Sequence, residues 1–181
     1  MAVSLRDSHA QFLAHLKQAG KAQATVIAYS KDIEQLVESL EETGKSDVSQ
    51  ITSADIEQFK DALKRKRYTS KSISRKINSI KAYFRHLISE GLIASNPADE
   101  VAHPKFDQAP PRVLSKLEYR ALRDAARGDV RMSAVIELLL QTGMRISELA
   151  AMELTDVDFD RSVITIQPQD SRGSRRVPMN A

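Results

Sequence analysis

The sequence predicts a mainly helical protein in two parts: a domain of four helices, then a smaller segment that ends in a β-hairpin. Apolar residues recur with helical spacing in four stretches of the first part. A stretch with three prolines and no periodicity follows, and beyond it short helical patterns give way to strand-like alternation. We therefore assign residues 1–103 to a helical domain, 104–112 to a linker and 113–181 to an incomplete second domain.

The first two helices are predicted from apolar residues on one side and glycines at their ends. Leu5, Phe12 and Leu16 share a face of the first helix, and Gly20 ends it. The second helix is expected over residues 22–42, before Gly44.

The third and fourth helices have clearer signals. Thr52 and Asp55 resemble a capping box, with an acid in place of the usual Glu or Gln, and this predicts a helix start. The fourth helix has a long apolar stripe that ends at Gly91: Ile73, Ile77, Ile80, Phe84, Leu87 and Ile88.

The second part begins with a full capping box, Ser115 to Glu118, which predicts a helix to about residue 126. Further helices are expected over 134–140, ended by Gly143, and over 146–152. Strands are expected over 162–167 and 175–179. Two strands do not close a stable sheet, so this domain is expected to be unfinished at residue 181.

The composition excludes several classes of protein. The chain has no cysteine, so it has no disulfide framework, no thiolate metal site and no cysteine nucleophile. No stretch approaches the roughly 20 apolar residues of a membrane span, and the N-terminus has no secretion signal. We expect a cytoplasmic protein with no membrane partner.

Basic residues are concentrated in one block. The chain has 27 Lys and Arg against 24 Asp and Glu, a formal net charge of +3. Residues 60–85 nevertheless contain a single acid, Asp61, and ten bases: Lys60, Lys64, Arg65, Lys66, Arg67, Lys71, Arg75, Lys76, Lys81 and Arg85. Such a block either meets a polyanion or is a solvated surface.

The residue pattern of the fourth helix favours binding to a polyanion. Opposite its apolar stripe the helix presents Lys71, Ser74, Arg75, Asn78, Lys81 and Arg85. Lys and Arg bind DNA phosphates, and Asn, Ser and Arg reach base edges in the major groove. The alternative is a solubilising face, and the near absence of acids favours DNA.

A second candidate site is Arg145, which precedes a predicted short helix and is followed by Glu148. An arginine beside free helix-terminal amides is well placed to bind a phosphate. The alternative is a surface pair with Glu148, worth a few tenths of a kcal/mol. Composition alone favours that alternative.

Longer motifs resemble a known family. The stretch LLQTGMRISELAAMELTDVDFDRSVITI with the later SRRVPMN is similar to the region around the first catalytic arginine of tyrosine recombinases, or phage integrases. The motifs TVIAYSKDI and SISRKINSIKAYFRHLISEGLIASNPA resemble that family's core-binding domain. The resemblance implies a four-helix SAM-like domain followed by the N-terminal part of an α+β catalytic domain.

The resemblance also implies a function. Family members are metal-independent DNA strand transferases that clamp double-stranded DNA, form a 3′-phosphotyrosyl link and act as tetramers. By this similarity Arg145 is the first catalytic arginine and Glu148 supports it, with no metal and no cofactor. The implied DNA-binding residues are those of the fourth helix, together with Lys64, Arg67 and Thr25.

The sequence also departs from the family pattern. No lysine follows Lys116, so the family's hairpin lysine is missing; Arg172 is the nearest cation, and an ungapped match places Asp170 there. All four tyrosines precede Arg145, and no His-x-x-Arg motif follows it.

We therefore expect a DNA-binding part of an integrase, active in DNA integration and recombination at the prokaryotic nucleoid, that does not itself cleave. Its oligomeric state stays open, a monomer included. The first alternative is a stand-alone regulator that occupies recombination sites without cleaving them. A helical interaction domain with no nucleic-acid role is a third reading.

Overall fold

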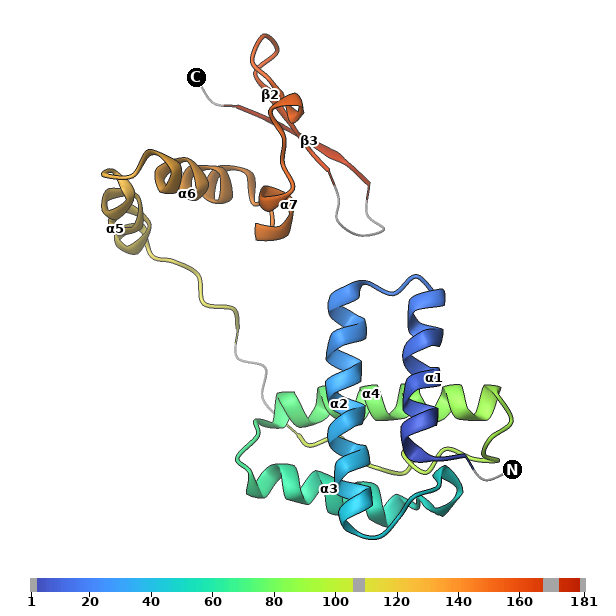
Figure 1. Cartoon of the computed structure of the whole chain (residues 1–181). Helices are drawn as coiled ribbons and strands as arrows, with labels where there is room; N and C mark the ends of the chain where they lie inside the picture. The colour runs from blue at the N-terminus through green and yellow to red at the C-terminus, as the bar shows by residue number, and fades with distance from the viewer. Residues whose placement is uncertain (1–2, 106–109, 168–172, 180–181) are drawn as a thin grey trace. The chain divides into compact units, whose positions relative to one another are not determined.

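The computed structural model describes residues 3–105, 110–167 and 173–179. The chain divides into two compact units, Met1–Gln108 and Ala109–Ala181, each with its own core. The first unit is helical, and the second combines helices with a small sheet (Figure 1). This architecture confirms the predicted fold class.

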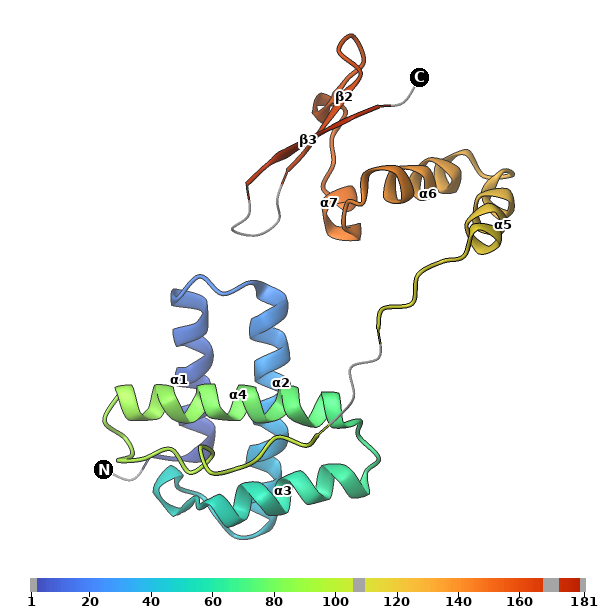
Figure 2. The same cartoon turned by 180° about the vertical axis from the view of Figure 1, so that it is seen from behind.

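The first unit is built from two crossed layers of helix. Figures 1 and 2 show α1 and α2 side by side as a hairpin, with α4 crossing both of them. The elements are α1 (Leu5–Gln18), α2 (Gln23–Glu42), the 3₁₀ turn η1 (Val48–Gln50), α3 (Ser53–Arg65) and α4 (Ser70–Ser89).

Side-chain caps fix where these helices begin. The Ser4 hydroxyl accepts a hydrogen bond from the Asp7 amide at 3.0 Å, and Thr69 does the same for Ser72 at 3.2 Å. At α3 the carboxylate of Asp55 accepts from the Thr52 amide at 2.7 Å. The predicted capping box is therefore confirmed, with aspartate in the position that Glu or Gln usually takes.

The first core is formed by side chains of all four helices of this unit. Its largest fully buried side chains are Tyr83, Phe12, Phe84, Leu5, Ile33 and Leu36. Phe12 meets the ring of Tyr83 edge to face at 5.5 Å between centroids. The Tyr83 hydroxyl shares a 2.6 Å hydrogen bond with Ser8, and burial raises the pKa of Tyr83 to about 12. Tyr83 is thus a core residue.

The segment after α4 returns along α3 and α4 (Figure 2). Ala98 and Val101 are buried in the first core. Lys60 of α3 donates to the carbonyl of Ala102 at 3.2 Å, which ties the segment to that helix. The chain therefore leaves the first unit only after a packed stretch.

The second unit combines three helices with a small antiparallel sheet, and residues of α6 and α7 pack with the strands. Its helical elements are α5 (Lys116–Ala126), α6 (Val130–Thr142), α7 (Ile146–Ala150) and the 3₁₀ turn η2 (Leu154–Asp156). The strands are β1 (Val157–Asp158), β2 (Val163–Ile166) and β3 (Arg175–Pro178), in the order β1-β2-β3. The register pairs Ile164 with Val177 and Ile166 with Arg175.

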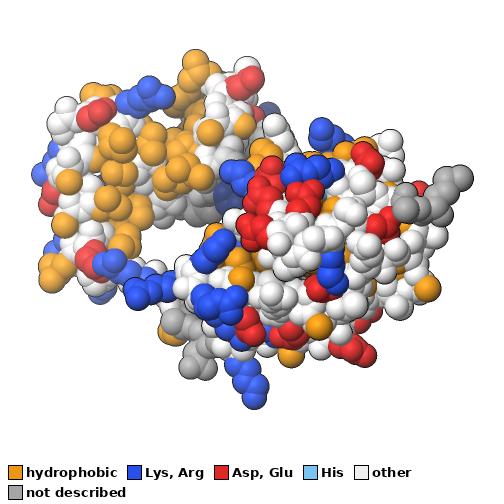
Figure 3. All heavy atoms as spheres, turned by 60° about the horizontal axis from the view of Figure 1, so that its bottom comes forward, with side chains coloured by type: hydrophobic (Ala, Val, Ile, Leu, Met, Phe, Trp, Pro, Cys, Tyr) orange, Lys and Arg blue, Asp and Glu red, His pale blue; other side chains and the backbone are white. Residues whose placement is uncertain are grey.

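The second core is small, and many apolar side chains of this unit are exposed. Met144, Ile164 and Ile166 are its buried hydrophobic cluster. The exposed ones include Val113, Leu117, Val130, Ile146, Leu154 and Phe159. Figure 3 shows hydrophobic side chains gathered over this unit.

Two elements differ from the sequence prediction. The helix expected over 134–140 begins at Val130, because the Asp129 carboxylate accepts a hydrogen bond from the Met132 amide at 3.0 Å. β1 adds a strand that the sequence did not indicate, since two residues are too few for a detectable alternation.

Candidate nucleic-acid interface

One face of α4 forms an exposed polar stripe. Four of its residues are exposed: Lys71, Arg75, Asn78 and Arg85. They follow one another at helical spacing, with Ala82 in the position between the last two, and so line one side of the helix. We call these four residues the α4 stripe. The opposite side holds Ile73, Ile77, Ile80, Phe84 and Leu87 in the core, which accounts for the orientation of the helix.

Two residues predicted for this face lie at its edge and contact the returning segment. The Ser74 hydroxyl is 3.0 Å from Nδ1 of His103, and Lys81 donates to the carbonyl of Asp99 at 3.3 Å. The structure therefore does not place Ser74 and Lys81 with the α4 stripe.

Arg75 has a buried partner that the helical pattern did not predict. Its guanidinium donates from both terminal nitrogens to the carboxylate of Asp32 on α2, at 2.5 and 2.8 Å. The Arg75 side chain is 50% exposed and that of Asp32 only 1%. The pattern of α4 alone does not reveal this pairing, because the acid lies on a neighbouring helix.

The other predicted DNA-binding residues lie outside the α4 stripe. Lys64 forms a 2.8 Å ion pair with Asp61 on its own helix, and Arg67 stands in the α3–α4 turn with φ of 60°. Thr25 lies in the first turn of α2 and is half-buried, seven residues before Asp32 and hence on the same side of α2. Thr25 thus shares the side of α2 that faces Arg75.

A hollow lies between α2 and Arg85, the last residue of the α4 stripe. Tyr29 of α2 and Arg85 of α4 line it with Lys21, His15 and His86, and its volume is about 400 Å³. The His15 and His86 rings stack at 4.5 Å between centroids. Burial lowers the pKa of His86, so this ring is neutral near pH 7.

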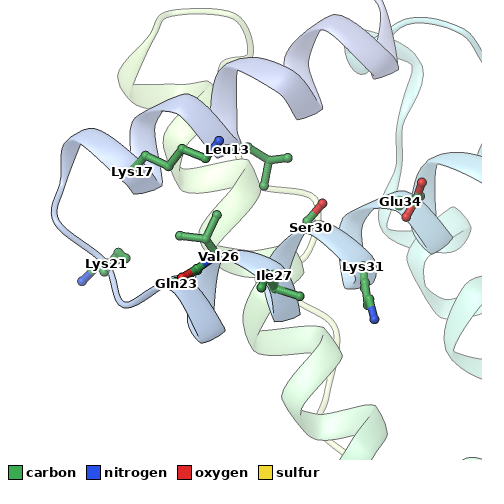
Figure 4. A pocket seen from close by; sticks show the side chains of 9 residues that line it. All are labelled: Leu13, Lys17, Lys21, Gln23, Val26, Ile27, Ser30, Lys31 and Glu34. Carbon is green, nitrogen blue, oxygen red and sulfur yellow. The ribbon is translucent and has the colours of Figure 1, made fainter. Parts of the chain in front are cut away.

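A second groove lies between α1 and α2. Figure 4 shows Lys31, Ile27 and Glu34 of α2 beside Leu13 and Lys17 of α1, and the groove has a volume of about 640 Å³. Helical geometry places Lys31 and Ile27 on the side of α2 away from Asp32 and Thr25. Lys31 and Ile27 can therefore serve as control residues when DNA binding by the α4 stripe is tested.

The second unit has a separate polar cluster at Arg145. Arg145 is the N-cap of α7, and its backbone amide donates to Glu148 at 2.7 Å. Its guanidinium donates to the other oxygen of Glu148 at 3.1 Å and is half-exposed. Arg175 of β3 donates to both oxygens of the same carboxylate, at 2.9 and 2.8 Å.

Glu148 is thus a buried carboxylate between two arginines. Its side chain is 4% exposed, so the alternative of a surface pair with Arg145 is wrong. Hydrogen bonds from the Arg175 side chain and from the Arg145 amide lower the pKa of Glu148 to about 2. The carboxylate stays ionised and holds Arg145 at the start of α7, while part of the guanidinium remains open to solvent.

Sequence reasoning missed Arg175. Strand alternation places Arg175 on the same side of β3 as Val177, which packs against the second core. An inward-facing cation needs an acid partner, and that signal was available in the sequence. Asp170 and Arg172, predicted for the hairpin turn, lie outside the described residues.

The described part of the chain holds neither a cluster of metal-ligating side chains nor a helix that could span a membrane. Among residues 3–105, 110–167 and 173–179, no three His, Cys, Asp or Glu side chains are grouped so as to hold a metal ion. Within the same described ranges, no helix has the length and apolarity needed to cross a membrane.

Comparison with family models gave two matches. The phage integrase N-terminal SAM-like domain matches residues 10–91, and the phage integrase family matches residues 112–181.

Individual relatives are tyrosine recombinases. The chain is 30% identical over 182 aligned positions to tyrosine recombinase XerC of Roseiflexus sp. (strain RS-1), covering 97% of this chain and 58% of that one. It is 33% identical over 175 positions to the XerC of Xanthomonas campestris pv. campestris (strain B100), covering 94% and 54%. The chain therefore spans a little over half the length of these curated relatives.

A solved structure has the same fold. A lambda integrase tetramer bound to a Holliday junction aligns with a TM-score of 0.82 at 21% identity, over 98% of this chain and 51% of that one. The two units of this chain therefore occur together in a known architecture.

Proposed function

Because the chain belongs to the phage integrase family of tyrosine recombinases, we propose that it binds duplex DNA at a recombination half-site for DNA integration and recombination. Residues 1–103 act as the DNA-binding domain, and residues 113–181 supply the first catalytic arginine. The relatives that match are tyrosine recombinases, and lambda integrase is bound to DNA in its solved complex.

The single observation that carries this proposal is the α4 stripe. Three cations and an asparagine project from one helix whose other side is buried, so they can enter a groove of DNA together. Thr25 extends this surface on α2. The four predicted residues outside the α4 stripe contact the sugar–phosphate backbone of the DNA around it: Ser74, Lys81, Lys64 and Arg67.

Arg145 takes a separate part in this function. Its half-exposed guanidinium beside the α7 amides suits the scissile phosphate, whose negative charge in the transition state needs fixed donors. Glu148 is a positioning residue, because it contacts Arg145 and Arg175 and is shielded from solvent. Arg172 is the nearest cation in the hairpin turn for the role of the family's lysine.

Salt-dependent binding to a random 30-bp duplex tests the proposal by fluorescence anisotropy. Log affinity is expected to fall linearly with log salt, and Lys71→Glu is expected to weaken binding and reduce that slope by about 1. Lys31→Glu makes the same change of charge on the other side of α2 and is the matched control. Equal losses in the two variants, or affinity that ignores salt, would contradict the proposal.

Arg145→Ala separates binding from chemistry. One phosphate contact is a small part of a surface this size, so we expect the affinity to fall by less than about threefold. A loss as large as that of Lys71→Glu would move the main DNA contact to the second unit.

A second candidate function is a regulator that occupies recombination sites without cutting. The hairpin turn favours it, because the sequence from Gln169 to Ser174 contains Arg172 and no lysine, and arginine is a poor proton donor. A nicked suicide duplex tests this: the regulator leaves no covalent protein–DNA adduct, and an adduct excludes it.

A further inference from the structure

Asp32 is a buried carboxylate with every lone pair engaged. One oxygen accepts from Arg75 and from Lys76, both at 2.8 Å, and the other accepts from Arg75 at 2.5 Å and Ser79 at 2.8 Å. All three donors come from α4, whereas Asp32 lies on α2. The carboxylate therefore fixes the side chains of one helix from another.

The two cations at this carboxylate differ in exposure. The Lys76 side chain is 6% exposed and also donates to Gln35 at 2.7 Å, so it is committed to the interior. The Arg75 side chain is 50% exposed. One negative charge thus faces two positive ones, and the surplus charge reaches solvent through Arg75.

The ion pair with Asp32 holds the plane of the Arg75 guanidinium in place and leaves part of its N–H donors available. A guanidinium has five N–H groups, and Asp32 accepts two of them. The remaining three lie in a plane that the two-point contact holds in place. An unheld arginine loses rotamer freedom when it binds a ligand, whereas Arg75 has lost that freedom already.

Arg75 also stands within the surface assigned above to DNA. Lys71 precedes it by one turn of α4 and Asn78 follows by one turn. A planar fork of N–H donors matches two oxygens of a phosphate.

We propose that Asp32 is a positioning residue that orients Arg75 to bind a backbone phosphate of duplex DNA. This inference rests on the proposed function. Asp32 does not touch the DNA itself; it sets the plane and the reach of the guanidinium that does.

The sign of the Asp32→Asn effect distinguishes positioning from simple charge. Removing a carboxylate raises the net charge by one, so charge alone predicts equal or tighter binding to DNA. Loss of the fixed orientation predicts weaker binding, by about two- to tenfold, from the usual ~0.5–1.5 kcal/mol for immobilising such a side chain. Because Arg75 keeps its charge, the salt slope is expected to stay unchanged.

A double-mutant cycle with the same 30-bp duplex completes the test. Arg75→Gln is expected to lower both affinity and salt slope, the slope by about 1. Asp32→Asn is expected to have no further effect in the Arg75→Gln background. Ser79→Ala removes another donor to Asp32 and is the control; it is expected to lower the unfolding midpoint while DNA affinity stays the same.

Several outcomes would overturn the inference. Tighter or unchanged binding by Asp32→Asn, or an additive cycle, leaves Asp32 with a structural role only. If circular dichroism shows that Asp32→Asn does not fold, Arg75→Lys decides, because lysine keeps the charge and lacks the planar fork. Weaker DNA binding at an unchanged salt slope supports the inference, and wild-type affinity overturns it. If the wild-type chain itself shows no salt-dependent binding, the proposed function fails as well.

Discussion

Removing Asp32 should destabilise the first unit more than removing the buried lysine that it binds. Asp32→Ala deletes four hydrogen bonds and leaves the Lys76 ammonium buried, with Gln35 as its remaining hydrogen-bond partner and the Tyr68 ring 5.4 Å away. An uncompensated buried charge of this kind costs about 3–5 kcal/mol. Lys76→Met instead leaves Asp32 with Arg75 and Ser79, so a cost below about 2 kcal/mol is expected.

Urea denaturation followed by circular dichroism at 222 nm measures both costs. With a slope of about 2 kcal/mol/M, Asp32→Ala is expected to lower the midpoint of the first unit's transition by about 2 M. Lys76→Met is expected to lower it by less than about 1 M. Equal shifts, or a larger one for Lys76→Met, would refute the reasoning that the carboxylate holds the two helices together.

Three further predictions follow from single contacts. The pKa of Glu148 is lowered from 4.5 to about 2, so its contribution to stability is present above pH 4.5 and is lost as the pH falls toward 2; thermal midpoints of Glu148→Gln should therefore change less over that range than those of the wild type. Gly143 ends α6 with φ of 61°, and Gly143→Ala is expected to cost about 1 kcal/mol in urea titrations; no cost would show that this conformation is not required. Tyr83→Phe should cost about 1 kcal/mol, because Ser8 retains its bond to the carbonyl of Leu5, and a loss above about 3 kcal/mol would contradict that account.

The fold was predictable because its signals are local. Helical spacing, glycines and caps located the long helices to within a few residues, since each signal lies within the helix that it defines. The start of α6 was missed because a single aspartate, Asp129, sets it, five residues before the strong apolar pattern begins. β1 was missed because its pairing partner, rather than its own sequence, makes it a strand.

The polar partners were less predictable because they join distant parts of the chain. Asp32 and Arg75 are 43 residues apart, and Glu148 and Arg175 are 27 apart. Helix periodicity identifies which face a residue occupies and leaves its partner on another helix undetermined. Arg75 therefore combines an ion pair with Asp32 and a proposed contact with DNA, so Lys71 is the better residue for charge reversal.

The central claim is that DNA lies against the α4 stripe, and an NMR titration of the ¹⁵N-labelled chain with duplex DNA tests it most directly. We predict that the largest chemical-shift changes fall on Lys71, Asn78 and Arg85 and on the neighbouring face of α2 at Thr25. Lys31 and Ile27, in the groove between α1 and α2, should change little. Changes concentrated in that groove, or spread evenly over the first unit, would contradict the claim.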